Sequence, residues 1–381
     1  MNNSTIQLIQ QLYREYYYSN IENIIMPKRF EEREFGYFRF NSQMIRHLSF
    51  NSLGDLRALI IKHVPKSVYY SVSFYQDPEA EMNVKGWKGG EIAFDIDCDD
   101  LVSKCKYKHD YWFCKSCGLS RYGKRPKTCK KCLSDKLGEL NWVCQICLDG
   151  AKNEVFKLLE ILDELGMSLK KSEIFFSGHM GYHLTIESEE FLDLDQPARS
   201  ELADYISGLH VNSETLGISK SSIYEDLVKT LPEVSESGWR GRIARGFHEN
   251  FDDIDGSKVS LAQKITQKNY RWLNKQVSNM SKIKGVSIDS AVTTDIHRIF
   301  RLPNTLHGET GFVKCQCDLD NFNPFVDPIV FSDELCKVKT RKIPVITLMD
   351  QKFGPYNSGE IVNLPFYMSV YLMGQGLAEV V

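Results

Sequence analysis

The stretch Glu91-Ile-Ala-Phe-Asp-Ile-Asp97 is the most informative part of the sequence for predicting the fold and the site. Its period of two is typical of a β-strand and puts the side chains of Asp95 and Asp97 on one face. Two carboxylates held this way can bridge two divalent cations about 3.5–4 Å apart, the arrangement used for nucleotidyl transfer. Mg²⁺ suits such a site because it keeps waters and substrate phosphates as its other ligands. A strand end that merely leads into an acidic turn, with Asp99 and Asp100, would show the same pattern.

The composition bounds the class of protein. With 381 residues, 42% of them hydrophobic, the chain is long enough for one large domain or two ordinary ones with buried cores. Its net charge of −3 means that any nucleic-acid contact requires Lys and Arg to be concentrated locally. Residues 104–136 show this concentration, with eleven Lys or Arg against two acids.

The beginning of the chain carries no basic region followed by an apolar run, and no apolar run is long enough to cross a bilayer. We therefore expect a soluble, cytoplasmic protein without membrane contact. In a reducing compartment, clustered cysteines are more often metal ligands than disulfides.

The cysteines of residues 104–149 fall into two sets with the spacing of tetrahedral zinc sites. The first set has two C-x2-C pairs separated by eleven residues, as in a short zinc ribbon: Cys114, Cys117, Cys129 and Cys132. The second set is a Cys3His site around the base of that ribbon: Cys105, His109, Cys144 and Cys147. Zinc here would contribute folding energy rather than catalysis. Buried thiols are the alternative, but the lysine-rich flanks do not suit an apolar core.

Hydrophobic periodicity predicts the remaining elements. Helices are expected over 5–25 and 153–165, strands over 33–40, 44–50 and 68–74, and mainly helical structure over 195–283. Residues 296–302 also look helical, which would put Arg298 and Arg301 on one face.

Two further stretches suit phosphate binding. In Ser177-Gly-His-Met-Gly-Tyr-His183, two glycines let the backbone approach a phosphate, and Ser177 and His183 can donate to it. An ordinary hairpin turn would have the same sequence. Arg298, Arg301 and His307 fall within ten residues and could clamp a triphosphate, or they could be solvated basic side chains.

These pieces occur in a characteristic order. The motifs are Arg33-Glu-Phe-Gly36, Met44-Ile-Arg-His-Leu-Ser-Phe50, Phe94-Asp-Ile-Asp97, Cys144-x2-Cys147, Ser177-Gly-x-x-Gly-x-His183, Ile288-Asp289 and Arg298-Ile-Phe-Arg-Leu-Pro-Asn-Thr-Leu-His-Gly308. Over about residues 10–312, the chain resembles the catalytic (small) subunit of archaeal and eukaryotic DNA primases, most closely the archaeal form.

The resemblance implies an α+β fold, a primase catalytic core with inserted zinc-binding modules and a helical subdomain. The expected organisation is an N-terminal part of the core with the D-x-D strand at 1–103, a zinc-binding insertion at 104–149, more of the core at 150–194, a helical subdomain at 195–283, and the completion of the core with a C-terminal segment at 284–381.

The resemblance also implies roles for individual residues. Asp95, Asp97 and Asp289 would be catalytic and hold the metals, with Asp289 rather than the nearby Asp295 as the third ligand. The nucleotide contacts would be Ser177, His183, Arg298, Arg301, His307 and Arg46, with Glu34 near the catalytic centre. The family's zinc knuckle matches the Cys3His set, so that the ribbon would be an insertion. Met180 stands where many relatives carry a basic residue, and His179 is a partial substitute.

The implied activity is template-directed synthesis of short RNA primers, or also DNA primers, on single-stranded DNA. It would use Mg²⁺ or Mn²⁺ for catalysis and one or two structural Zn²⁺. NTPs or dNTPs, an RNA primer and a primase large subunit in a heterodimer are the expected partners. Two alternatives are a primase–polymerase of a repair or mobile-element system and a non-catalytic zinc nucleic-acid-binding protein. The ribbon itself suits nucleic-acid contact, a solvated zinc module, or a docking surface for another protein.

Overall fold

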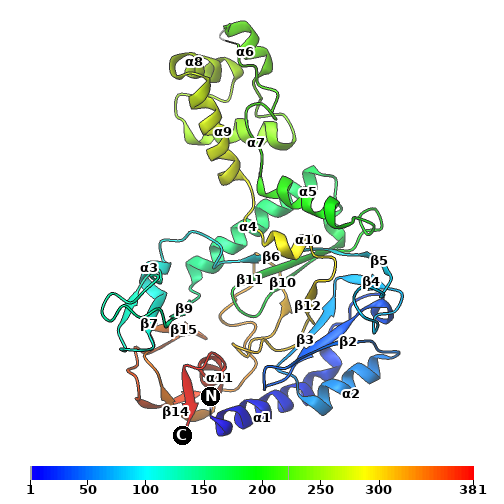
Figure 1. Ribbon diagram of the computed structural model, residues 1–381, viewed down its shortest axis with the longest axis vertical. Coiled ribbons are helices and arrows are strands. Elements are labelled where there is room, and N and C mark those ends of the chain that lie inside the picture. The colour runs from blue at the N-terminus through cyan, green and yellow to red at the C-terminus, as the bar shows by residue number, and fades with distance from the viewer. Residues whose placement is uncertain (1, 222) are drawn as a thin grey trace. The chain divides into compact units, whose positions relative to one another are not determined.

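A computed structural model describes residues 2–221 and 223–381 (Figure 1). The chain forms two compact units. The first consists of Met1–Lys152, Glu173–Asp193 and Asp295–Val381, and the second consists of Asn153–Ser172 and Leu194–Thr294. In the described residues, no helix has the length and apolar character needed to cross a membrane.

The first unit contains a sheet built around the D-x-D strand. The strand order is β13 (Cys315–Gln316), β10 (Ser172–Phe176), β11 (Gly181–Ile186) and β6 (Ile92–Asp97). The predicted strand at 91–97 is confirmed. Side chains on both faces of β6 are buried as far as Phe94, and its two carboxylates remain partly exposed at the end of the strand. Burial on both faces fixes the register, because a slip by one residue would exchange apolar and acidic positions.

A second sheet of the first unit has the order β12 (Ile299–Arg301), β3 (Ser67–Ser71), β1 (Phe35–Phe38) and β2 (Met44–Leu48). Helices α1 (Asn3–Asn20) and α2 (Leu53–His63) pack against each other beside it (Figure 1). Asn2 caps α1, because its side chain accepts a hydrogen bond from the Thr5 amide at 2.8 Å. The strands predicted over 33–40 and 44–50 are confirmed with shorter bounds, and the opening helix is confirmed as Asn3–Asn20. The single strand predicted over 68–74 is divided into two, β3 and Ser73–Tyr75, which belong to different sheets.

The helix predicted over 296–302 is wrong. Residues Ile299–Arg301 form β12, which pairs antiparallel with β3, and Phe300 lies opposite Tyr70. Pairing with the edge of β3 and burial of the Phe300 ring outweigh the local helical pattern. Arg298 lies before β12 and Arg301 is its last residue, so the shared helix face expected for these two residues is wrong as well.

The second unit is helical around its own apolar core. Its elements are part of α4 (Gln145–Glu164), η3 (Leu169–Lys171), α5 (Gln196–Ser207), α6 (Tyr224–Thr230), α7 (Gly238–Asn250), α8 (Lys258–Lys268), α9 (Tyr270–Lys284) and α10 (Ser290–Thr294). Ile243 and Phe247 of α7 pack with Leu273 and Val277 of α9 in that core. The mainly helical character predicted for 195–283 is confirmed, as is the helix over 153–165.

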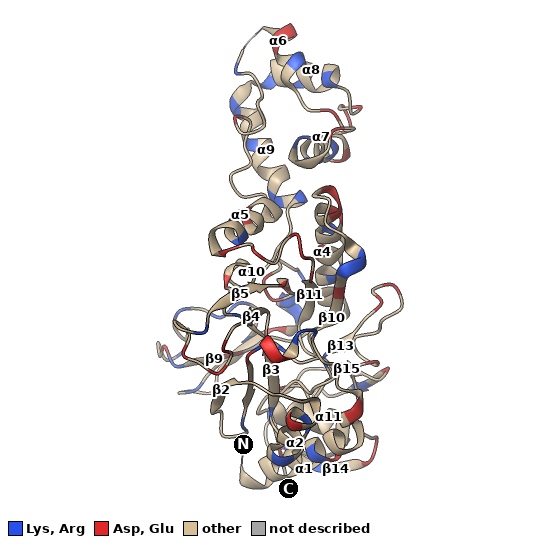
Figure 2. Ribbon diagram, turned by 90° about the vertical axis from the view of Figure 1, so that its right-hand side faces the viewer, with Lys and Arg blue, Asp and Glu red and all other residues tan. Residues whose placement is uncertain are grey.

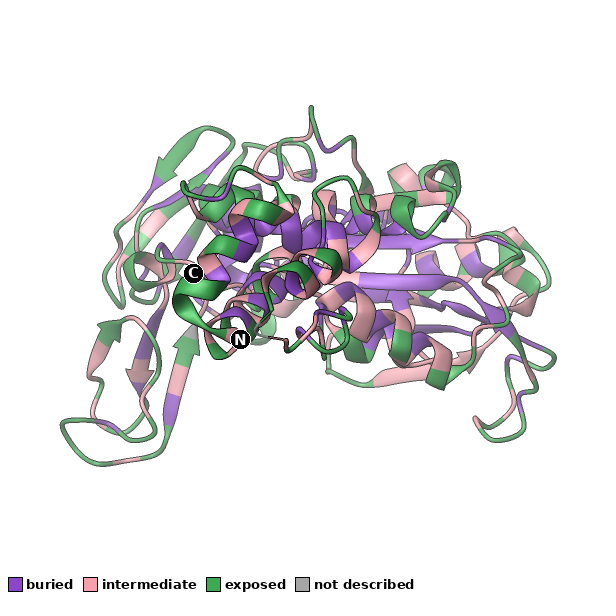
Figure 3. Ribbon diagram, turned by 90° about the horizontal axis from the view of Figure 1, so that it is seen from above, coloured by how far each residue is buried: buried purple, intermediate pink, exposed green. Residues whose placement is uncertain are grey.

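The zinc-module residues form α3 (Lys106–His109) and a small sheet of β8 (Ser120–Tyr122), β7 (Tyr111–Cys114) and β9 (Leu137–Leu140). The remaining elements of the first unit are η1 (Ile21–Asn23), η2 (Phe30–Glu32), β4 (Ser73–Tyr75), β5 (Trp87–Gly90), β14 (Leu335–Thr340), β15 (Ile346–Leu348), β16 (Gln351–Phe353), β17 (Ile361–Pro365), α11 (Phe366–Gly374) and β18 (Ala378–Val380). Figure 3 shows buried residues concentrated along interior strands and helices, whereas peripheral hairpins are mostly exposed.

Candidate active site and zinc centres

The candidate metal ligands of the first unit lie on β6, directly beside β11. The antiparallel register puts His183 opposite Asp95 and Gly181 opposite Asp97. The His183 Nε2 atom is 3.5 Å from an Asp95 carboxylate oxygen. Burial and the neighbouring Asp95 charge raise the pKa of Asp97 well above its usual value. A bound cation would relieve both effects, so these two carboxylates fit a divalent metal.

The glycine of the β10–β11 turn leaves space at these carboxylates. A Cβ atom at Gly181 would lie 1.9 Å from the Ile96 carbonyl oxygen and 2.7 Å from an Asp97 carboxylate oxygen. The turn is closed by Ser177, whose amide donates to the Gly181 carbonyl at 2.8 Å and whose Oγ accepts from the Gly181 amide at 3.2 Å. The Gly-rich turn is therefore a hairpin that keeps the end of β6 open.

His183 is buried against an aromatic ring, with one nitrogen available. Its ring stacks on Phe300, with centroids 4.5 Å apart and an angle of 16° between the planes. Burial, and then the charge of Lys314, hold the pKa of His183 well below its usual range, so the ring is neutral at physiological pH. Its Nδ1 is buried and has no hydrogen-bond partner among the described residues. Such an orphaned buried atom suits a ligand group.

Arg301 and His307 line one cavity of about 320 Å³, together with Lys66 and the backbone around Gly308. Arg301 donates through Nη1 to the Ser177 carbonyl at 2.7 Å, which ties the basic cavity to the Gly-rich turn. The Arg301 Nε atom is buried without a partner in the described part of the chain. Such unused donors suit an anionic group.

The histidines of this region are neutral. Burial, followed by the Arg301 charge, lowers the pKa of His307 well below its usual range, and the same causes lower that of His179 to about 4. The two rings lie 4.9 Å apart. His307 Nδ1 accepts a hydrogen bond from the Glu309 amide at 3.1 Å, so a neutral ring carries its proton on Nε2 and can donate there.

Lys66 is a member of this cavity that sequence reasoning missed. Its side chain packs against Gly308, where an added Cβ would meet the Lys66 Cγ atom at 2.6 Å. A single lysine after a proline, more than 200 residues from Arg301, carries no spacing signal. Only the pairing of β12 with β3 reveals that these residues are neighbours.

Arg298 precedes β12, and its carbonyl accepts a hydrogen bond from the Val72 amide at 3.0 Å. Its charge contributes to the lowered pKa of His183. Arg298 does not line the cavity that holds Arg301 and His307.

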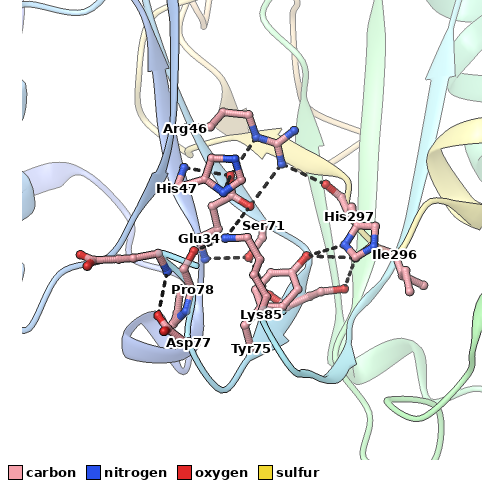
Figure 4. Close-up of polar contacts among 12 residues, drawn as sticks. Glu34, Arg46, His47, Ser71, Tyr75, Asp77, Pro78, Lys85, Ile296 and His297 are labelled. Carbon is pink, nitrogen blue, oxygen red and sulfur yellow. Dashed lines mark hydrogen bonds and ion pairs between the residues drawn. The ribbon is translucent and has the colours of Figure 1, made fainter. Parts of the chain in front are cut away.

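Arg46 lies in a separate polar cluster around Glu34 (Figure 4). Glu34 is fully buried and accepts hydrogen bonds from Arg46 Nε at 2.8 Å and Nη2 at 3.2 Å, while Lys85 Nζ lies 3.3 Å away. Burial alone would raise the pKa of Glu34, but the Arg46 hydrogen bonds and charge outweigh it, and the pKa is lowered. Arg46 also donates to the His297 carbonyl at 3.3 Å, next to Arg298 in the chain.

The two predicted cysteine sets both come together. In each set, the four ligand atoms lie within 4.8 Å of one another, as in a tetrahedral site. The members are Cys105, His109, Cys144 and Cys147 in one set and Cys114, Cys117, Cys129 and Cys132 in the other. Every cysteine of the chain is a free thiol.

The distances within these sets fit zinc. Sulfur atoms are separated by 3.3 Å in the Cys105–Cys147 pair and by 3.5 Å in the Cys114–Cys132 pair. A tetrahedron with Zn–S bonds of about 2.3 Å has edges of about 3.8 Å. His109 directs Nε2 at Cys147, and its Nδ1 lies 2.7 Å from an Asp110 carboxylate oxygen, the outer partner typical of a zinc-bound histidine. Both centres are therefore suited to Zn²⁺.

The remaining candidate, Asp289, belongs to the second unit. Its carboxylate accepts a hydrogen bond from the Ala291 amide at 3.0 Å at the start of α10. Asp295, which the resemblance passed over, lies in the first unit and accepts from the His297 amide at 2.8 Å.

The site combines two carboxylates on one strand, which can hold divalent cations, with a neighbouring cavity whose arginine has an unused donor for phosphate. This combination is typical of a nucleotidyltransferase. Comparisons with known proteins narrow this class. The family model described as DNA primase small subunit matches residues 128–318. The chain is 35% identical to the DNA primase small subunit of Cenarchaeum symbiosum and 33% identical to that of Nitrosopumilus maritimus, in each case over 100% of both chains. It is 30% identical to that of Archaeoglobus fulgidus, over 97% of both. The chain belongs to the DNA primase small-subunit family, of archaeal type.

Proposed function

We propose that this chain is the catalytic subunit of a DNA primase that makes short RNA primers on single-stranded DNA by template-directed nucleotidyl transfer. The observation that carries the proposal is the β6–β11 register, which puts the Asp95 and Asp97 carboxylates beside His183 and an open turn. Family membership supports the activity, and the basic cavity of Arg301 supports a triphosphate substrate.

The proposed metal ligands are Asp95, Asp97 and Asp289, with Mg²⁺ or Mn²⁺ as the cation. The raised pKa of Asp97 supports a cation at the first two, and Asp289 rests on the sequence resemblance. When bound, such cations activate the attacking 3′-hydroxyl and neutralise charge on the leaving pyrophosphate.

The protein's own side chains would hold the triphosphate in line. Arg301 and Lys66 would neutralise phosphate oxygens in their shared cavity, and the neutral His307 would donate through Nε2. Ser177 and His183 would contact the phosphate-bearing nucleotide at the turn, His183 through its unpartnered Nδ1. Donors fixed by packing need little reorganisation as charge develops in the transition state.

Arg298 and Arg46, which lie outside the Arg301 cavity, would supply further nucleotide contacts, as the sequence resemblance implies. Arg46 is fixed by Glu34 and by the His297 carbonyl, so its guanidinium is held in one place before any substrate arrives. Preorganisation of this kind reduces the entropy lost on binding.

The proposal includes partners and location. Single-stranded DNA would be the template, NTPs or dNTPs the substrates and an RNA primer the product. A primase large subunit would complete a heterodimer, with Zn²⁺ as a structural ion in the two cysteine centres. This role would put the chain in the cytoplasm, at sites of replication.

The test is the Asp95→Asn variant, in an assay with single-stranded DNA and labelled NTPs in Mg²⁺ or Mn²⁺. Primer synthesis should fall at least about a thousandfold, because removal of a catalytic metal ligand removes transition-state charge stabilisation. Glu189→Gln is the matched control, since it removes an exposed carboxylate charge from the same unit, and it should retain full synthesis. Substantial synthesis by a folded Asp95→Asn variant would refute the assignment. A parallel assay with labelled dNTPs separates a replicative primase from a primase–polymerase that prefers deoxynucleotides.

A further inference from the structure

The zinc module carries an exposed basic and aromatic surface that the proposed active site does not use. Ten of the eleven Lys and Arg side chains in residues 104–136 are exposed. Figure 2 shows basic segments in the loops beside β9. Two tyrosines of the same module are also exposed, Tyr107 by 68% and Tyr122 by 54%. Large aromatic rings left in water among cations are typical of a surface that stacks on bases and contacts phosphates.

A groove lies on this surface. It has a volume of about 340 Å³ and is lined by residues from within 99–111, by residues 123–125, and by Glu139 and Asn141. We call it the ribbon groove. Its cationic side chains include Lys106, Lys124 and Arg125, and Tyr107 also lines it, next to Gly123. Its first lining residue, Asp99, is two residues beyond Asp97, so the groove begins next to the D-x-D strand.

Carboxylates also line the groove, but two of the three already have partners. Asp110 accepts from the Trp142 amide at 3.0 Å and lies against His109. Glu139 forms an ion pair with Arg125 at 3.5 Å, and both side chains are 47% exposed. An ion pair so exposed contributes little, so Arg125 can exchange Glu139 for a phosphate at small cost.

We propose that the ribbon groove binds single-stranded nucleic acid, with phosphates on Lys124 and Arg125 and a base stacked on Tyr107. The chemistry recognised is an anionic backbone that alternates with flat aromatic rings. Contacts of this type read no sequence, because every base has a stacking face. The inference deepens the proposed function, since the strand would be the template or the new primer. Binding can nevertheless be measured without synthesis.

The first experiment measures the affinity of the full chain for a fluorescent oligo-dT by anisotropy at several salt concentrations. The variant is Lys124→Glu with Arg125→Glu. Affinity at low salt should fall at least about tenfold, and the salt dependence should become shallower by about 0.7 per lost phosphate contact. The matched control is Lys337→Glu with Lys339→Glu, which makes the same charge change on the exposed face of β14 and should alter affinity less than about twofold.

A second pair of variants separates stacking from charge. Tyr107→Ala should weaken binding about fivefold or more, because it removes the stacking ring. Tyr107→Phe keeps the ring and should bind like the wild type. Glu139→Gln should tighten binding about twofold, since it removes the carboxylate that competes for Arg125. Zinc content and a thermal melt of each variant report whether the module is folded.

Unchanged affinity in both the Lys124/Arg125 and Tyr107→Ala variants would overturn the inference and favour a protein-docking or merely solvated module. An equal loss of affinity in the β14 control would also overturn the inference, since the more negative net charge of the protein would then explain the weaker binding. Failure here is distinct from failure of the proposed function. If the wild-type protein makes primers but its DNA affinity does not depend on the groove residues, only the proposal that the groove binds nucleic acid is refuted. If the wild-type protein binds DNA through the groove but incorporates no nucleotide, only the proposed primase activity is refuted.

Discussion

The catalytic sheet and the zinc module hold polar side chains in place by different means. In β6 and β11, apolar side chains buried on both faces fix the register that brings Asp95 and His183 together. Among the described residues, the ribbon has a small core cluster of four buried residues, Trp112, Cys114, Cys129 and Leu137, two of which are candidate zinc ligands. A core this small offsets little of the entropy of ordering the chain, so a metal bound at the cysteines would have to contribute. We therefore expect the positions of the carboxylates to depend on packing, and the ribbon groove to depend on bound zinc.

The largest expected effect comes from disrupting the ribbon. Cys117→Ser should lower the zinc content by one ion per chain and remove hydrogen-exchange protection from β7 and β9, because three ligands hold zinc far more weakly than four. The amides of β6 and β11 should stay protected. Cys315→Ser, which lies outside both centres, is the control and should change neither quantity. Equal loss of hydrogen-exchange protection in β6 and β7 would show that the catalytic sheet depends on the ribbon cysteines as much as the ribbon itself does.

The second prediction concerns a substitution that disrupts the catalytic sheet. Gly181→Ala should destabilise the protein by about 2–4 kcal/mol, because the new Cβ collides with the backbone of β6. It should also abolish primer synthesis, while both zinc ions stay bound. Gly150→Ala is the control, since its Cβ meets only a Leu101 methyl group at 3.4 Å and alanine favours the helix. Urea unfolding with a zinc assay measures both outcomes. Wild-type stability of Gly181→Ala would mean that β6 and β11 are not packed as described.

The last effect concerns pH dependence alone and rests on Lys314, a fully buried lysine that packs near Phe175 and Phe300 and donates to the Arg301 carbonyl at 2.8 Å. Burial, and then the Arg301 charge, lower its pKa to about 7. The unfolded chain, with a lysine pKa of about 10.4, therefore binds a proton between about pH 7 and pH 10 that the folded chain does not. The free energy of unfolding should rise with pH across this window.

Lys314→Met removes this titration, so the variant's unfolding free energy should rise less steeply than that of the wild type over the same range. Lys337→Met, at an exposed site on β14, should leave the slope unchanged. Identical slopes for wild type and Lys314→Met would contradict the lowered pKa.

Local patterns predicted much of this molecule because they depend on near neighbours in the chain. The alternation in 91–97 and the C-x2-C spacings each describe contacts within a few residues or one hairpin, and the structure confirms the strand and the gathering of each cysteine set. The helix predicted over 296–302 was wrong because β12 gains its hydrogen bonds from β3, more than 200 residues away. Lys66 was missed for the same reason. The role of Asp289 stays a prediction, since it rests on the motif alone.

The central claim is that the carboxylates on β6 serve template-directed synthesis, and the most direct test is synthesis itself. The purified chain, with and without added large subunit, is given unprimed single-stranded DNA, Mg²⁺ or Mn²⁺ and radiolabelled NTPs, and the products are separated by size. The account predicts short RNA chains complementary to the template that disappear when Asp97 is replaced by asparagine. Absence of any product from wild-type protein in every condition, or full synthesis by a folded Asp97→Asn variant, would contradict it.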